Sequence, residues 1–298
     1  MESMRVSMLM PVYNEAPTIA EAIRRVRAVP LDIQLICVDD ASTDGTAAVL
    51  KRLREAGEID DLVVHATNRG KGAAVRSALA CAAGDVVVIQ DADLEYDPQE
   101  LVGLIGPIRD GRADAVFGSR FTGHTHRVLY YWHSVGNHLL TTLSNMATNL
   151  NLSDMETCYK MVRSDLMKSL PLSANRFGIE PELTARLAQA GARIYEVPIT
   201  YSGRTYAEGK KIGWKDGGAA LWHILRANFL SEKSPLYAGP QPVAESARRA
   251  ATMGAGRADR DSLPAVLAPG VPEDLDHLDR SRAAPQLVQM EPGVEEPG

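Results

Sequence analysis

Short apolar runs alternate with amphipathic segments up to Gly118, and this alternation limits the possible folds more than any other feature. The pattern predicts strands at 6–12, 33–38, 62–65, 86–89 and 115–118, separated by helices at 18–27, 45–55, 72–82 and 99–109. Repeated strand–helix–strand units require a mostly parallel sheet with helices on both faces. We therefore predict an α/β fold with a mostly parallel central sheet.

Composition sets further limits on function and location. With 298 residues, of which 45% are hydrophobic, the chain is able to bury a substantial core, and its net charge of −6 argues against a protein that coats nucleic acid. The cysteines Cys37, Cys81 and Cys158 lack metal-type spacing, which fits a reducing cytosol. No apolar run is long enough to span a bilayer, so we expect a cytoplasmic protein.

The composition changes after Pro235. Residues 236–298 hold eight of the seventeen prolines, with scattered charges and no sustained helical or strand period. Such a segment buries too little apolar surface to fold alone. We predict a catalytic domain at 1–235 and a disordered tail at 236–298 that is dispensable for chemistry.

Polar residues follow the predicted strands, at the edge where open α/β sheets bind ligands. The motif MPVYNE follows the first strand, and VDDASTDGT follows the second. Turn and helix-cap chemistry is an equal explanation for Ser42, Asp44 and Gly45. The adjacent carboxylates of Asp39 and Asp40 would repel each other unless a cation or hydrogen-bond donors satisfy them.

The motif QDADLEYDP follows the buried run at 86–89 and brings three carboxylates to the same edge. Asp91 and Asp93 alternate on an extended segment and converge with Glu95 in our interpretation. Carboxylate oxygens of this kind bind Mg²⁺ or Mn²⁺ when the ion also holds substrate phosphates. A solvated acidic turn is the alternative.

The segment NRGKG at 68–72 places Lys71 at the start of a predicted helix. Small residues, a cation and a helix N-terminus suit a phosphate or a nucleotide edge, although a solvated lysine beside a glycine turn is common. The spacing differs from a Walker loop, and GxGxxG does not follow the first strand. The sequence thus lacks the defining motifs of NTPases and dinucleotide-binding enzymes.

Together, MPVYNE, VDDASTDGT, NRGKGAAVRSALA, QDADLEYDP and FGSR resemble the motifs of glycosyltransferase family 2, in the same order, over about residues 4–230. The nearest branch is the dolichol- or polyprenyl-phosphate sugar synthases. The resemblance implies the GT-A fold, which is Rossmann-like, and an inverting reaction. It also implies a nucleotide diphosphate sugar as donor and a polyprenyl phosphate as acceptor, with GDP-mannose as the favoured donor.

The resemblance also implies roles for residues on the donor side. Pro11, Tyr13, Glu15 and Asp40 match positions that hold the base and ribose. Lys71 is a further substrate-binding candidate from its own segment, which suits a phosphate or a nucleotide edge. The metal ligands would be Asp91, Asp93 and Glu95. The last position is often glutamine in the nearest synthases, so Glu95 adds a negative charge.

On the acceptor side, Arg120 matches the arginine that faces the lipid phosphate, and Arg127 is a second candidate. The basic loop GRTYAEGKKIGW is similar to the family's loop over the diphosphate, which implies Arg204, Lys210 and Lys211. Fixed cations would stabilise the charge on the leaving diphosphate. A solvent-exposed basic loop is the alternative.

Asp154 and Glu156 lie where family members with hydroxyl acceptors place a catalytic base. An alcohol needs such a base, whereas a lipid phosphate is already an oxyanion. We expect Asp154 to orient a substrate and its Asn variant to keep substantial activity. Glu180 and Glu182 either position the sugar or begin a helix, where acidic residues are favoured.

Two apolar stripes at helical spacing suit either a core or a membrane surface. Their members are Leu139, Leu143, Met146 and Leu150 in the first, and Trp214, Leu221, Trp222, Leu225, Phe229 and Leu230 in the second. Nearby cations would suit anionic lipid headgroups. We predict peripheral contact with the inner face of the cytoplasmic membrane.

We thus predict a metal-dependent hexosyltransferase that inverts the anomeric carbon and uses polyprenyl phosphate as acceptor. One alternative is a family 2 enzyme with a hydroxyl acceptor and Asp154 as base. Another is a non-catalytic protein that binds nucleotide sugars, against which the complete carboxylate set argues.

Overall fold

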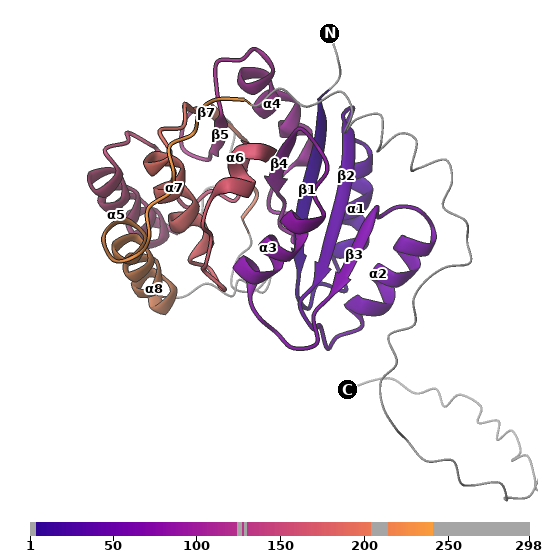
Figure 1. Cartoon of the computed structure of the whole chain (residues 1–298). Coiled ribbons are helices and arrows are strands. Elements are labelled where there is room, and N and C mark those ends of the chain that lie inside the picture. Colours follow the sequence, from indigo (N-terminus) through magenta and orange to yellow (C-terminus); the bar gives the residue numbers. More distant parts are fainter. Residues whose placement is uncertain (1–3, 124–126, 128–129, 204–213, 241–298) are drawn as a thin grey trace, which may run out of the picture. The chain divides into compact units, whose positions relative to one another are not determined.

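A seven-stranded sheet forms the centre of the computed structural model, which describes residues 4–123, 127, 130–203 and 214–240 (Figure 1). The strands are β1 (Arg5–Val12), β2 (Asp32–Asp39), β3 (Asp61–Val64), β4 (Val86–Ile89), β5 (Ala115–Ser119), β6 (Lys160–Arg163) and β7 (Ile194–Pro198). Their order is β3-β2-β1-β4-β6-β5-β7, and only β6 pairs antiparallel to its neighbours within it. The predicted mostly parallel sheet is confirmed.

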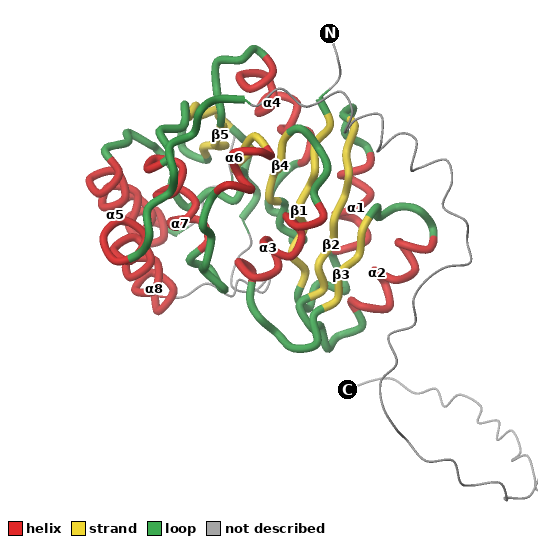
Figure 2. Tube along the Cα trace, in the orientation of Figure 1, coloured by secondary structure: helices red, strands yellow, loops and turns green. Residues whose placement is uncertain are grey.

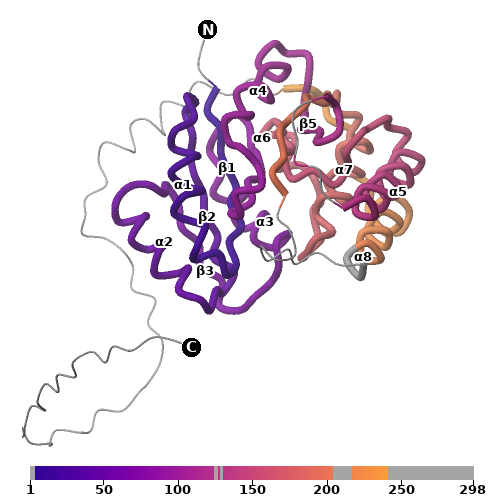
Figure 3. The backbone as a smooth tube through the Cα atoms, turned by 180° about the vertical axis from the view of Figure 1, so that it is seen from behind, coloured from indigo at the N-terminus to yellow at the C-terminus, as the bar shows by residue number. Residues whose placement is uncertain are grey.

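Helices lie on both faces of this sheet. They are α1 (Ile19–Arg27), α2 (Thr46–Glu55), α3 (Lys71–Cys81), η1 (Pro98–Glu100), α4 (Leu101–Arg109), α5 (Tyr131–Thr148), α6 (Ser164–Ser169), α7 (Ile179–Gln189), α8 (Trp214–Leu225) and the π-helical turn η3 (Arg226–Leu230). Helices α3 and α6 lie in front of the strands in Figures 1 and 2, whereas α1 lies in front in the opposite view (Figure 3). Helices α5, α7 and α8 pack together at the end away from α2.

The central strands read as continuous apolar runs because both of their faces are covered. In β1, Leu9 pairs with Ile36 of β2 and with Ile89 of β4, and all three are buried. Val12 pairs with Asp39, and the Asp40 amide donates to the Val12 carbonyl at 2.9 Å. This register places the two loops that follow β1 and β2 side by side.

The antiparallel β6 was not predicted, and it decides which loop reaches the site. Lys160 pairs with Phe117, near the end of β5, and Met161 pairs with Val88 of β4. A strand that runs against its neighbours begins where they end. Residues 149–159, which lead into β6, are therefore delivered to the carboxyl edge of the parallel strands.

A buried network of hydrogen bonds connects β1, β2 and the residues before β4 near the amino ends of these strands. The Ser7 hydroxyl donates to Gln34 Oε1 at 2.6 Å and accepts from the Gly84 amide at 2.8 Å. Gln34 Oε1 also accepts from the Ala83 amide. Because each buried polar atom has a partner, the network fixes the start of β4 against β1 without a desolvation penalty.

The predicted boundary between the domain and the tail falls at Pro235. The Tyr237 amide donates to the Ala190 carbonyl at 2.9 Å, and its hydroxyl donates to Asp165, so packing continues to that residue. Most of the predicted tail, from residue 241 onward, lies outside the described residues. Among the helices that are described, none combines the length and the apolar character needed to cross a membrane.

Gly84 should tolerate no side chain. A Cβ atom there would lie 2.7 Å from the Arg5 carbonyl oxygen and 2.8 Å from the Ser7 amide nitrogen, and both are backbone atoms. We expect Gly84→Ala to lower the free energy of unfolding by about 1–3 kcal/mol in urea titrations. Gly103→Ala in α4 is the control, since its Cβ would meet only Val197 Cγ1 at 3.8 Å, and it should stabilise by up to about 1 kcal/mol. Equal effects of the two variants would contradict this account.

Candidate active site

The loops after β1 and β2 form one hydrogen-bonded unit. The Asn14 amide donates to Ser42 Oγ at 3.0 Å, and the Thr43 amide donates to Asn14 Oδ1 at 2.8 Å. Asp44 accepts from the Thr46 amide and hydroxyl. Ser42 and Asp44 therefore stabilise the turns before α2, whereas the N-cap residue of that helix is Gly45 and not Ser42 or Asp44.

Asp40 holds the NRGKG segment in place. Its Oδ1 is 2.6 Å from His65 Nδ1 and accepts from the Arg69 amide at 2.9 Å, while its Oδ2 accepts from the Gly70 amide at 2.6 Å. Burial acts to raise the pKa of Asp40, but His65 and the two amides lower it below its usual value. Asp39 accepts from the Ser42 amide, so the predicted repulsion between the two neighbouring carboxylates is relieved by hydrogen bonds.

The predicted nucleotide-binding side chains of the first loop differ in exposure. Pro11 and Glu15 are half-buried, and the ring of Tyr13 is 43% exposed. The Glu15 amide donates to Thr46 Oγ1 at 2.9 Å, which fixes the backbone of this loop against the start of α2. The Tyr13 ring is therefore accessible on an ordered loop.

Gly70 and Gly72 are required by close packing. Gly70 has φ of 90°, and a Cβ at Gly72 would lie 2.2 Å from the Ala174 carbonyl oxygen. The Ala73 amide donates to the Asn175 carbonyl at 3.1 Å. The glycines thus let the chain before α7 approach the start of α3.

Lys71 bridges two carboxylates. Its Nζ is 2.8 Å from Asp91 Oδ1 and 2.7 Å from Glu180 Oε1. Burial acts to lower the pKa of Lys71, but the nearby acidic groups raise it well above its usual value. Glu180, in the first turn of α7, is therefore part of the site.

The acidic motif after β4 is organised by internal contacts. The Glu95 amide donates to Asp93 Oδ1 at 3.2 Å, and Tyr201 Oη donates to Glu95 Oε2 at 2.7 Å. Within the described part of the chain, no three carboxylate, histidine or cysteine side chains have the geometry to hold a metal ion. The predicted convergence of Asp91, Asp93 and Glu95 on one ion is therefore not seen among the described residues. Mg²⁺ usually takes one or two protein carboxylates and completes its shell with water and substrate phosphates, so a metal site at Asp91 and Asp93 stays a prediction.

Half-buried Arg120 and fully buried Asp154 form a bidentate ion pair. Arg120 Nε donates to Asp154 Oδ2 at 2.6 Å, and Arg120 Nη2 donates to Asp154 Oδ1 at 2.7 Å. Asn137 of α5 accepts from Arg120, whose guanidinium also lies 5.1 Å from the centre of the Tyr201 ring. Planar fork-to-fork pairs of this kind are strong and directional.

Asp154 is fully engaged in this pair. It is completely buried, and its Oδ2 also accepts from the Arg120 amide at 3.1 Å. Burial acts to raise the pKa of Asp154, but Arg120 holds it below its usual value. A general base must reach the proton that it removes. This geometry suits a residue that positions Arg120 better than one that deprotonates a hydroxyl.

Two further glutamates in the site have unsatisfied oxygens. Glu156 Oε1 and Glu180 Oε2 are buried, and among the described residues no hydrogen-bond partner contacts either atom. Burial and the charge of Glu180 raise the pKa of Glu156 to about 7.

Of the four other predicted basic site residues, the structure describes only Arg127. Arg127 is exposed, its amide donates to the Tyr201 carbonyl at 3.1 Å, and its Nη1 donates to the Gly203 carbonyl at 3.3 Å. Arg204, Lys210 and Lys211 lie outside the described residues. Their role over the diphosphate stays a prediction.

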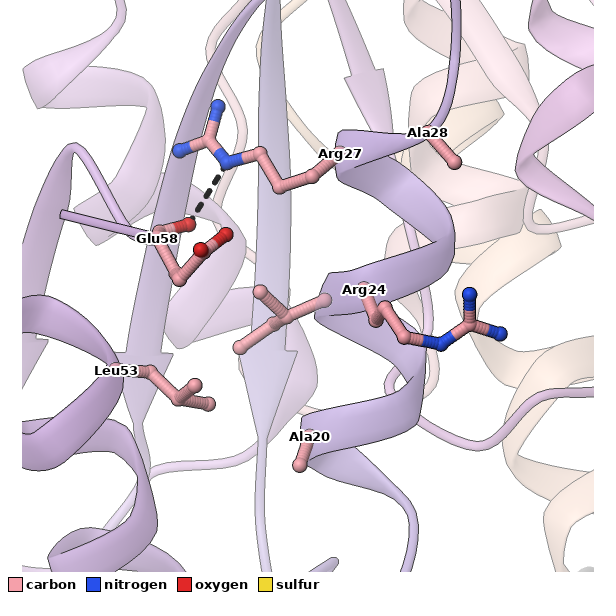
Figure 4. Close-up of a pocket in the computed structure, with 7 residues that line it drawn as sticks. Ala20, Arg24, Arg27, Ala28, Leu53 and Glu58 are labelled. Atoms are coloured by element: carbon pink, nitrogen blue, oxygen red, sulfur yellow. Dashed lines mark hydrogen bonds between the residues drawn. The ribbon is translucent and has the colours of Figure 1, made fainter. Parts of the chain in front are cut away.

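A surface hollow lies at the other edge of the sheet. It measures about 450 Å³ and is lined by Ala20, Ile23, Arg24, Arg27, Ala28, Leu53 and Glu58 (Figure 4). Arg27 crosses it to donate from Nε to the Glu58 carbonyl at 2.8 Å, and Arg27 Nη1 donates to Ile33 at the start of β2. The hollow is therefore separate from the loops at the strand ends.

Residues 7–170 match the family described as Glycosyl transferase family 2. The undecaprenyl-phosphate mannosyltransferase of Micrococcus luteus is 31% identical over 252 residues, which cover 76% of this chain and 99% of that protein. The polyprenol monophosphomannose synthase of Mycolicibacterium smegmatis is 29% identical, covering 70% and 82%. Glucosyl-3-phosphoglycerate synthase from Mycobacterium tuberculosis, solved with Mn²⁺ and UDP-glucose, has a TM-score of 0.60 at 21% identity over 77% of this chain and 80% of that one.

Neutralising Asp154 should destabilise the fold. Asp154→Asn leaves the buried Arg120 guanidinium without its counter-charge, so we expect the free energy of unfolding to fall by about 3–5 kcal/mol in urea titrations. The double variant with Arg120→Met should lose less than the sum of the single losses. Asp110→Asn, which breaks the exposed pair with Arg112, is the control and should have little effect. Additive losses for Asp154 and Arg120 would contradict this coupling.

Proposed function

The chain belongs to glycosyl transferase family 2, has the GT-A fold and is a glycosyltransferase; from this premise we propose that it transfers a hexose from a nucleotide diphosphate sugar to a polyprenyl phosphate with inversion at the anomeric carbon. GDP-mannose is the proposed donor because two of its relatives are named as mannosyltransferases of polyprenyl phosphates. Polyprenyl phosphate is thus the proposed acceptor and GDP-mannose the proposed donor.

The engagement of Asp154 by Arg120 is the observation that carries this proposal. A hydroxyl acceptor would need a base, but both oxygens of Asp154 bond to the guanidinium. A phosphate acceptor is already an oxyanion and needs a cation instead. Arg120 is the proposed source of that charge, with Arg127 as the proposed second contact. The alternative with Asp154 as base is therefore less favoured.

The donor would lie along the loops after β1, β2 and β4. We assign the base and ribose to Pro11, Tyr13 and Glu15, with Asp40 shaping the adjoining loop. Lys71 would lie on the diphosphate side, because it contacts Asp91. An exposed tyrosine ring on an ordered loop suits stacking on a base.

Asp91 and Asp93 would hold Mg²⁺ or Mn²⁺ together with the diphosphate, with Glu95 close by. When bound, the ion would offset the negative charge that develops on the leaving group. The acceptor phosphate oxygen forms the new bond to the anomeric carbon as the bond to the nucleotide diphosphate breaks. No proton has to be removed from the acceptor. The basic loop at 204, 210 and 211 is proposed to add further positive charge.

Lipid labelling tests this function directly. We expect the full chain with Mn²⁺ to move radiolabel from GDP-mannose into an acid-labile product in the organic phase, only when polyprenyl phosphate is present and EDTA is absent. Asp93→Asn should lower the rate about 100-fold, on the scale of losing one electrostatic contact in a transition state. Asp97→Asn is the control, since Asp97 caps η1 on the same segment. Parallel assays with UDP-glucose and UDP-N-acetylglucosamine would show whether another sugar is the one transferred to the lipid. Transfer of label only to hydroxyl acceptors would contradict the proposal.

We also propose that α5 and α8 rest on the membrane that holds the lipid acceptor. The two buried residues of helix α5, Thr141 and Ser144, are both polar, although the polar residues His138 and Thr142 are exposed. Trp132 and Met146 are 78% and 76% exposed, and the helix contains no Asp, Glu, Lys or Arg. A helix that points its polar side into the protein and its apolar side outward is typical of a lipid-facing surface.

The neighbouring helix extends this apolar surface. Helix α8 packs against α5, and Trp222, Phe229 and Leu230 on α8 and η3 are exposed. Lys233 is exposed beside them and would suit an anionic headgroup. Asn137 connects α5 to Arg120, so the surface is joined to the proposed phosphate contact.

Vesicle flotation tests this membrane contact. We expect the full chain to float with vesicles that contain anionic lipid, and the triple variant Trp132→Ser, Leu139→Ser and Met146→Ser to bind at least 10-fold more weakly, because each exposed apolar side chain contributes about 1.5–3 kcal/mol when buried. Val64→Ser is the control, because Val64 is 63% exposed on β3. Equal flotation of the triple variant and the wild type would exclude this surface.

A further inference from the structure

Glu180 is buried and Glu156 is half-buried, and each has a buried oxygen that the proposed reaction does not use. Lys71 bonds to Glu180 Oε1 at 2.7 Å, but in the described ranges nothing donates to Glu180 Oε2 or to Glu156 Oε1. Buried polar atoms without a partner are rare because they lose their hydration without compensation. Two such atoms in one site indicate that a ligand with hydrogen-bond donors completes them.

The surrounding charges do not satisfy these oxygens. The Lys160 ammonium is buried nearby, but it donates to the carbonyls of Met155 and Thr157, at 2.7 and 2.6 Å. Arg120 is occupied by Asp154. The other charged or titratable groups close to the pair are Lys71, Asp91 and Cys158, and Lys71 already bridges Asp91 and Glu180.

The position of the pair indicates which part of the substrates it meets. Glu180 is connected through Lys71 to Asp91, which is on the proposed diphosphate side. Glu156 is two residues from Asp154, which holds Arg120 on the proposed acceptor side. The group that lies between a donor diphosphate and an acceptor phosphate is the sugar that is transferred.

We infer that Glu156 and Glu180 bind hydroxyl groups of the transferred hexose and so contribute to the choice of sugar. This inference rests on the proposed function, because it needs a nucleotide sugar in the site. Carboxylate oxygens accept hydrogen bonds from sugar hydroxyls, and a carboxyl that keeps its proton also donates one. The raised pKa of Glu156 lets it play either part near neutral pH. A site whose polar groups need a substrate hydroxyl discriminates strongly against ligands without it.

Calorimetric titration of the full chain with Mn²⁺ tests this role without catalysis. The probes are GDP and GDP-mannose, with UDP and UDP-glucose as a second pair. We expect wild type to bind one sugar nucleotide more tightly than its parent diphosphate. Glu156→Gln and Glu180→Gln should each weaken binding of that sugar nucleotide about 10-fold and change binding of the diphosphate by less than about 2-fold, as expected for loss of one hydrogen bond to a charged group.

Melting temperature separates this role from a structural one. Glu156→Gln removes a buried acid that lacks a partner, so its melting temperature should equal or exceed that of wild type. Glu182→Gln is the matched control on α7, because Glu182 accepts from the Ser173 and Ala174 amides. It should melt at a lower temperature and keep the wild-type ratio of the two affinities.

Three results would overturn the inference. An unchanged ratio in both Gln variants would exclude sugar recognition by the pair while the proposed function stands. Equal weakening of the diphosphate and the sugar nucleotide would show a general structural role. A wild-type chain that binds none of the nucleotide sugars would remove the proposed function and this inference together.

Discussion

The ion pair between Arg120 and Asp154 connects several segments of the described active site. Arg120 follows β5, Asp154 lies in the loop before β6, and Asn137 reaches the pair from α5. Tyr201 lies under the guanidinium. A buried cation without its partner would be costly, so the pair holds these four segments in one arrangement. In the proposed function, this engagement is the reason why Asp154 does not serve as a base.

The acidic groups of the site are kept together by fixed positive charge and by directed amides. Lys71 lies between Asp91 and Glu180, and Asp40 accepts from the Arg69 and Gly70 amides. Such compensation allows several carboxylates to share a small volume at the strand ends. These contacts hold the loops at the strand ends in place before any substrate binds. Within the described residues, one buried oxygen each of Glu156 and Glu180 has no hydrogen-bond partner, and these are the atoms that we infer a substrate completes.

The grouping of the motifs at the strand ends could be predicted because their residues follow strands in the chain. Parallel strands end at one edge, so motifs after β1, β2 and β4 had to meet there. The contacts of Asp40 and Glu180 could not be predicted. Asp40 is satisfied by amides that lie 29 and 30 residues later, and Glu180 reaches Lys71 across more than a hundred positions. Local patterns carry no information about such distant partners.

The sequence by itself determined the family, the α/β class and the edge of the sheet where the chemistry lies, because periodicity and motif order are local properties of the chain. Only the tertiary structure decided how individual carboxylates are used. The antiparallel β6 brings residues 149–159 to the site, and that placement turns Asp154 toward Arg120 and leaves an oxygen of Glu156 unsatisfied. Burial and hydrogen-bond partners determine whether a carboxyl group is charged and which groups it contacts. Both depend on segments that meet only after folding.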